Sequence, residues 1–183
     1  MTEELPPRRF QRLRREADPA RGVEGVVRDG MCLSAFVLLG RAGSAGEVLL
    51  GRIDPSAPWD RLGGLSAERV RSIGEAWMLP SSHLIEYEAP VEAARRVARE
   101  QLELPALPLR GPEVFSEAYH RPGTEPEEHH WDLHFVFRGD WPGGPSARAA
   151  PFRELRFFAP DELGTLEVAR GGADLLRLAG VLP

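Results

Sequence analysis

The clearest pattern in this sequence is an apolar stripe of helical period that begins directly after Pro90. Val91, Ala94, Ala98 and Leu102 recur at intervals of three and four residues, which predicts a helix with one buried face. Proline suits the first helical position because its missing N–H would have no partner there. Any fold of this chain must therefore pack the helix against a core along one side.

Several segments outside this helix have the apolar clustering of β-strands and are separated by turn residues. We expect strands over residues 32–39, 47–53, 77–80, 113–119, 130–137 and 154–158. A hairpin loop is expected over 41–46 and another loop over 81–89, whereas 54–76 is interpreted as an insertion with a short helix over 66–73. Two more short helices are expected over 161–163 and 171–178.

Length and charge narrow the classes of protein to which this chain can belong. At roughly 150 residues per domain, 183 residues predict one domain with or without a tail. The 23 basic residues against 28 acidic ones give a net charge of −5, which disfavours binding of bulk nucleic acid. All the basic residues are arginines, so chemistry that needs a lysine amine is excluded. No apolar stretch approaches the roughly 18–20 residues of a membrane span, and we expect a cytoplasmic protein without membrane contact.

The sequence divides into a basic N-terminal part and a domain. Residues 1–30 are expected to form an arm or a short helix, and residues 31–183 the folded domain. The stretch from Arg8 to Arg21 carries six arginines and two acidic residues, a composition typical of a solvated extension. The single cysteine, Cys32, lies in an apolar run over 31–39, and we interpret it as a thiol in the core.

The segment from Trp77 to Leu104 resembles the signature of the Nudix superfamily. That signature is a Gly followed at fixed spacing by a Glu, an Arg-Glu pair, two adjacent Glu and a closing Gly. Its register fits without a gap at Glu88, Arg96, Ala98, Glu100 and Leu104, and the wider resemblance covers about Cys32 to Leu163. It implies an α/β fold, an α/β/α sandwich with a mixed sheet, and hydrolysis of a nucleoside diphosphate linked to another moiety with Mg²⁺ or Mn²⁺ as cofactor.

We call this signature the box. In this chain the box is degenerate, because four of its positions carry other residues. Ser82 stands where the box has its first Gly, Val97 where it has Glu, Gln101 where it has the second paired Glu, and Glu103 where it has the closing Gly. Positions 97, 100 and 101 share one helix face, and three carboxylates there would bind a hard cation. This chain offers one carboxylate and one amide, so the spacing predicts the fold better than the activity.

The remaining box residues have assignable roles. The resemblance implies that Glu88 and Arg96 tie the loop to the helix, and a bidentate ion pair between them would do so. Glu100 is the candidate catalytic residue and, with Glu103, the candidate metal ligand, with Glu117 or the His130 side as further sources of ligands. In the plainer alternative, Glu100 belongs to a surface row of ion pairs with Glu92, Arg96 and Glu103.

A second polar cluster lies on the strand expected over 130–137. His130, Asp132 and His134 alternate, so they share one face, while Trp131 takes the other. We name these four residues as candidate ligand-binding residues. The pattern fits a transition-metal site, the wall of a nucleotide pocket where His and Trp stack on a base, or a polar outer face.

Two functions from different classes follow from the resemblance. One is a weak or atypical metal-dependent hydrolase, and the alternative is a catalytically inactive module that binds a nucleotide or related phosphate-containing small molecule. An isomerase on the same scaffold is a third option that no sequence feature selects. Family members often pair, so a homodimer is also an expectation.

Overall fold

A computed structural model of the chain describes residues 12–13, 31–44, 46–121, 128–142, 151–169 and 171–182, with backbone alone for 12–13, 118–121 and 128–130. The strands are β1 (Arg12–Leu13), β2 (Met31–Arg41), β3 (Val48–Ile53), β4 (Ser81–His83), β5 (Arg110–Arg121), β6 (Glu128–Trp141) and β7 (Phe152–Phe158). The helices are α1 (Trp59–Leu62), α2 (Ala67–Ile73), α3 (Pro90–Gln101), α4 (Pro160–Leu163) and α5 (Gly172–Leu178).

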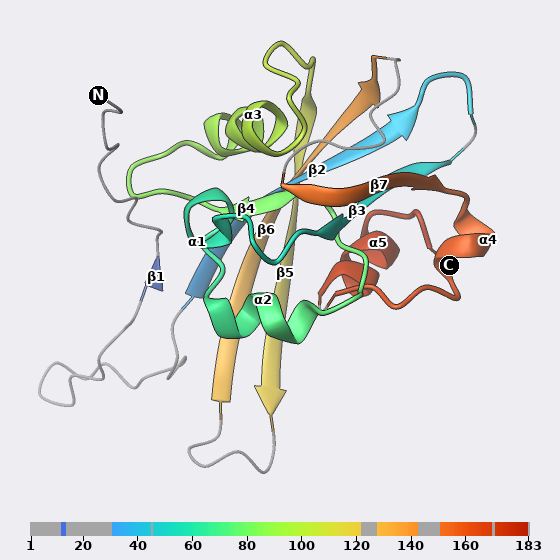
Figure 1. Ribbon diagram of the computed structural model, residues 1–183. Helices are drawn as coiled ribbons and strands as arrows, with labels where there is room; N and C mark the ends of the chain where they lie inside the picture. The colour runs from blue at the N-terminus through green and yellow to red at the C-terminus, as the bar shows by residue number, and fades with distance from the viewer. Residues whose placement is uncertain are drawn as a thin grey trace, which may run out of the picture.

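The strands form one mixed sheet in the order β5-β6-β2-β3-β7 (Figure 1). β2 and β6 run parallel from the pair Met31 and Trp131 to the pair Arg41 and Trp141. The pairs β5–β6, β2–β3 and β3–β7 are antiparallel. The apolar β2, which is buried on both sides for most of its length, therefore lies at the centre of the sheet.

The two strands β2 and β3 diverge, and the segment over 77–83 lies between them. β3 pairs with β2 only at Gly40 and Val48. Nearer the start of β2, its residues 34–36 pair antiparallel with β4. The first two residues of β2 pair antiparallel with β1. Met78 forms an isolated bridge with Gly51 of β3. This divergence brings the start of the candidate box into the sheet itself.

Helices cover both faces of the sheet. Alternate residues of β2 therefore pack in two separate apolar clusters, one on each face. On the face that we call the α3 face, Ala35, Val37 and Leu39 pack in one cluster with residues of α1, α2 and α3. On the opposite face, called the α5 face, Leu38 packs with residues of α4 and α5. The α/β/α arrangement with a mixed sheet, expected from the sequence, is confirmed.

Most predicted elements are present, with two corrections around the box. The predicted strand over 77–80 is wrong, because Trp77 and Met78 form only isolated bridges. The predicted loop over 81–89 was too long, because Ser81–His83 pairs with β2 as β4. The short helix α1 in the insertion was not predicted. Cys32 is buried and free, as expected.

Two expectations concern the chain outside the core. Of the N-terminal arm over 1–30, only Arg12 and Leu13 are described, and they form β1; the rest lies outside the described residues. Among the helices of the described residues, none has the length and apolar character needed to cross a bilayer.

Arg138 of β6 links the edge strand β5 and the C-terminal helix to the sheet. Its Nε and Nη2 donate to the two carboxylate oxygens of Glu113 at 2.7 and 3.0 Å, and Nη2 also donates to the Ala179 carbonyl at 2.6 Å. The hydrogen bond from Arg138 lowers the pKa of the Glu113 carboxyl below its ordinary value; burial opposes this shift and the guanidinium charge reinforces it.

We expect this pair to make the stability depend on pH. Because the pKa of Glu113 is lowered in the folded protein, its ionised form stabilises the fold above the ordinary pKa, and this contribution disappears as pH falls through the lowered value. Glu113→Gln should therefore melt below the wild-type protein at pH 7, and calorimetry should show the difference shrinking below pH of about 4. Arg138→Gln should be less stable than the wild-type protein both at pH 7 and below pH of about 4, because it also loses the hydrogen bond to the Ala179 carbonyl. A deficit of Glu113→Gln that is independent of pH would contradict this account.

Candidate functional site

The turn that leads into α3 is closed by Glu88. Its N–H donates to the Ile85 carbonyl at 2.9 Å, and the Ile85 N–H donates to Glu88 Oε2 at 2.9 Å. Tyr87 lies within this turn with a φ of 66°, a left-handed conformation that such a turn position usually gives to glycine. These two hydrogen bonds fix the position of the Glu88 carboxylate.

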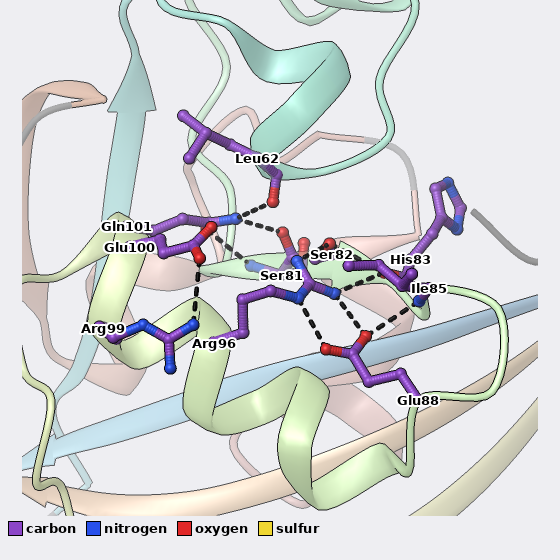
Figure 2. A network of polar contacts seen from close by, with 10 residues as sticks. All are labelled: Leu62, Ser81, Ser82, His83, Ile85, Glu88, Arg96, Arg99, Glu100 and Gln101. Carbon is purple, nitrogen blue, oxygen red and sulfur yellow. Dashed lines mark hydrogen bonds and ion pairs between the residues drawn. The ribbon is translucent and has the colours of Figure 1, made fainter. Parts of the chain in front are cut away.

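Arg96 contacts this carboxylate from the middle of α3 (Figure 2). Nε donates to Glu88 Oε1 at 2.8 Å and Nη2 to Oε2 at 2.7 Å, so the expected bidentate pair is present. Nη1 donates to Ser82 Oγ at 3.0 Å and Nη2 to the His83 carbonyl at 3.1 Å. Arg96 is only 4% exposed, so its charge depends on these acceptors. One side chain thus connects the turn, β4 and α3.

The serine pair that replaces glycine at the start of the box adopts ordinary extended backbone. Ser82 pairs with Ala35 of β2, and Ser81 with Phe36. Among the described residues, the positive φ values outside glycine are those of Tyr87 and Glu103. Serine is compatible with a β-strand, and Ser82 supplies a hydroxyl for Arg96, so no glycine is needed here.

The Gln101 carboxamide is completely buried at the end of α3 (Figure 2). Its Nε2 donates to the Ser81 carbonyl at 2.8 Å and to the Leu62 carbonyl at 3.1 Å. Its Oε1 accepts from the Ser81 N–H at 3.2 Å. The side chain therefore joins α3 to β4 and to α1, and both its N–H groups have acceptors.

The insertion over 54–76 covers this part of α3. Leu62 is the last residue of α1, and Gly63, which follows it, accepts a hydrogen bond from the His83 N–H at 3.2 Å. Val97, one turn before Gln101, is 1% exposed and packs in the same apolar cluster as Leu62. Two of the three positions at which the box would carry metal-binding carboxylates are therefore part of the core.

Glu100 and Glu103, the two candidate metal ligands, lie apart from this core. Glu100 accepts from Arg99 Nη2 at 3.1 Å, and its side chain is 18% exposed. Glu103 lies past the end of α3, exposed and with a φ of 58°. The surface row of ion pairs predicted for Glu92, Arg96, Glu100 and Glu103 is wrong in part, because Arg96 is buried against Glu88 and Glu92 pairs with Arg95.

These residues do not fit a hard divalent cation. Such an ion takes several oxygen ligands, usually carboxylates, whereas α3 offers an apolar Val97 and a Gln101 amide already saturated by backbone groups. Within the part of the chain that the structure describes, no group of three or more His, Cys, Asp and Glu side chains is placed to hold a metal ion.

The second polar cluster lies on the α5 face of the sheet, opposite α3. His134 Nε2 contacts Glu117 Oε2 at 3.1 Å, and because a carboxylate only accepts, Nε2 carries the proton. On the neighbouring strand Ser34 Oγ is 3.0 Å from His83 Nδ1. The side chains of His134 and Ser34 are almost fully buried, yet His134 Nδ1 has no partner among the described residues. Such an atom costs about 1–3 kcal/mol if it stays unsatisfied.

The four candidate ligand-binding residues do not share one surface. Asp132 pairs with Cys32 and Glu117, in the register that places it beside His134 on the α5 face. Trp131 points to the other face, where its Nε1 donates to Ser116 Oγ at 2.6 Å and the residue is 38% exposed. The side chain of His130 lies outside the described residues. Trp131 and His134 therefore cannot line one pocket.

Sequence reasoning missed two contacts of these sites. The Leu62 carbonyl that accepts from Gln101 has no sequence signal, since any residue supplies a carbonyl and the four-residue α1 has no period. The Ser34–His83 contact depends on the pairing of β2 with β4. Alternation places Ser34 on a face of its strand, but it does not indicate the partner strand.

Comparisons with known proteins agree with the fold of this chain. The NUDIX domain family model matches residues 36–178, so this chain belongs to the NUDIX domain family. A comparison with curated protein sequences found no match.

Among solved structures, the chain is similar to DR0079 from Deinococcus radiodurans, with a TM-score of 0.56 and 18% identity over 80% of this chain and 82% of that one. It is similar to RenU, a Nudix hydrolase from M. smegmatis, with a TM-score of 0.52 and 22% identity over 83% and 86%. It is also similar to the NUDIX domain of Shewanella oneidensis NrtR, with a TM-score of 0.52 and 12% identity over 90% and 92%. At these identities the likeness shows the fold alone.

We expect Arg96 to be required for stability. Arg96→Met leaves the partly buried Glu88 carboxylate without its partner, which should lower the free energy of unfolding by about 3 kcal/mol. Arg95→Met is the matched control, because Arg95 is on the same helix and its ion pair with Glu92 is more than half exposed; it should change stability by no more than about 1 kcal/mol. Urea unfolding measures both, and equal losses would show that the buried contacts of Arg96 carry no special weight.

We also expect the left-handed backbone at residue 103 to cost stability. Glu103→Gly should raise the free energy of unfolding by about 1 kcal/mol and the melting temperature by about 2–4 °C, because glycine adopts a positive φ without strain. Glu103→Gln keeps the backbone cost and should change stability by less than about 0.5 kcal/mol. A lower melting temperature for the glycine variant would show that the Glu103 side chain has a stabilising contact in solution.

Proposed function

We propose that this chain is a NUDIX-fold module that binds a nucleotide or related phosphate-containing small molecule and does not hydrolyse it through α3. The observation that carries this proposal is the replacement of carboxylates on α3 by a buried Val97 and a hydrogen-bonded Gln101. Water attack on a pyrophosphate needs a cation that orients the phosphate and activates the water. The single carboxylate of Glu100, already paired with Arg99, gives such a cation too few anionic ligands.

The polar cluster on the α5 face supports ligand binding there. His134 Nδ1 lacks a partner, while Glu117 fixes the ring from the other nitrogen. A ribose hydroxyl of a ligand, which can both donate and accept a hydrogen bond, would satisfy Nδ1. Asp132 lies on the same face, and we assign the hydroxyl-bearing part of the ligand to this cluster because of His134 Nδ1.

A solved relative gives a precedent for ligand binding by this fold. The NUDIX domain of NrtR was crystallised with ADP ribose, a nucleoside diphosphate linked to a sugar. This fold can therefore form a site for such a molecule, and ADP ribose is the first compound to test with this chain.

Hydrolysis is the second candidate, favoured by membership of the family and by the partial burial of Glu100. In that case Glu100 would be the catalytic residue, and Glu100 with Glu103 would bind Mg²⁺ or Mn²⁺. Loss of turnover in Glu100→Gln would support this candidate over the first.

One experiment separates the two candidates. The purified chain is incubated with ADP ribose and other nucleoside diphosphate derivatives, with Mg²⁺, with Mn²⁺ or with EDTA, while calorimetry records binding and chromatography records cleavage. We expect binding without cleavage, and binding that EDTA does not abolish. Cleavage that requires the cation and Glu100 would overturn the proposal.

Two substitutions locate the ligand. His134→Ala should weaken binding by about tenfold or more, because a desolvated hydrogen bond to the ligand is worth at least about 1.4 kcal/mol. Trp131→Ala is the control on the opposite face and should change the affinity by less than about threefold. The reverse order of effects would assign the ligand to the α3 face.

A further inference from the structure

We propose that the Gln101 carboxamide takes the place of a bound cation, so that α3, β4 and α1 are joined by a permanent internal group instead of an exchangeable ion. This inference concerns how the chain holds its degenerate box together and does not rest on any ligand. It follows from what surrounds Gln101 Nε2, not from the sequence of the box.

Two backbone carbonyls point at the same nitrogen. The oxygens of Ser81 and Leu62 are 2.8 and 3.1 Å from Gln101 Nε2, and Figure 2 shows them approaching it from β4 and from α1. Carbonyl oxygens carry partial negative charge, so two that converge need a hydrogen-bond donor or a cation between them. The N–H groups of the amide supply that donor within a completely buried side chain.

The same position with a glutamate would have the opposite character. A carboxylate at residue 101 could still accept from the Ser81 N–H, but its other oxygen would face the Ser81 and Leu62 carbonyls. Three oxygens would then surround one point, which is repulsive without a cation and is a suitable ligand set for a hard cation. The difference between amide and carboxylate therefore decides whether this junction needs an ion.

The decisive variant is Gln101→Glu, which has nearly the same shape as the natural side chain. In EDTA at pH 7 we expect its melting temperature to fall by about 5–10 °C, because one buried contact becomes repulsive. Mn²⁺ should reverse this loss in a concentration-dependent way. Calorimetry should show Mn²⁺ binding at least about tenfold tighter than to the wild-type chain.

Acid provides an independent rescue of the same variant. The two carbonyls disfavour the ionised carboxyl of residue 101 in the folded protein and so raise its pKa. The variant should therefore recover stability relative to wild type as pH falls in EDTA, since a protonated carboxyl can donate to a carbonyl as the amide does. Gln101→Met is the matched control: it loses the same N–H groups and should be destabilised, but neither Mn²⁺ nor acid should restore it.

The wild-type chain itself gives a further test, which does not depend on whether a variant folds. In nitrogen-15 spectra, the Gln101 side-chain N–H₂ signals should exchange slowly with deuterium, and Mn²⁺ should not broaden them. Broadening of these signals, or a lower wild-type melting temperature in EDTA, would show that a cation binds at this junction and would overturn the proposal. So would a Gln101→Glu variant that responds to Mn²⁺ no more than Gln101→Met does. None of these measurements uses a nucleotide, so they succeed or fail independently of the proposed function.

Discussion

The arrangement of turn, strand and helix around the box depends on the buried guanidinium of Arg96. A charge that is 4% exposed must find acceptors inside the protein, because its desolvation would otherwise cost several kcal/mol. Glu88, Ser82 and the His83 carbonyl are those acceptors, and they come from two different segments. The guanidinium is planar and fixes the direction of each bond, so the turn and β4 can take only positions that fit it.

This constraint separates the structural part of the box from its chemical part. Arg96 and Val97 are adjacent on α3, yet Arg96 contacts the turn and β4 while Val97 packs in the apolar cluster beneath α1. The contacts of Arg96 do not pass through residues 97 or 101. The loop can therefore remain in place while those two positions become apolar or neutral, which explains how a chain can retain the fold of the family without carboxylates at positions 97 and 101.

The parts of the structure that follow from spacing could be predicted from the sequence, and those that follow from pairing could not. The stripe from Val91 to Leu102 predicts α3, because helical geometry converts sequence distance into direction. The contact between Glu88 and Arg96 was expected from the resemblance to the Nudix signature, since Glu88 precedes the first residue of the helix. β4 was missed because a three-residue strand has too little alternation to be recognised. The Leu62 carbonyl that meets Gln101 was missed for a different reason, since a backbone acceptor is independent of residue type.

The two polar sites of this chain differ in whether their hydrogen-bonding capacity is filled. At Gln101 both N–H groups and the oxygen have backbone partners, so a ligand arriving there would have to break more bonds than it could form. At His134 one nitrogen is fixed by Glu117 and the other, buried nitrogen has no partner among the described residues, so a ligand hydroxyl that reaches this nitrogen gains a bond without breaking one there. Desolvation of polar groups therefore disfavours ligand binding at Gln101 on the α3 face and favours it at His134 on the α5 face. For this reason an apolar or amide substitution on α3 and a polar cluster on the opposite face are consistent with one molecule that binds without cleaving.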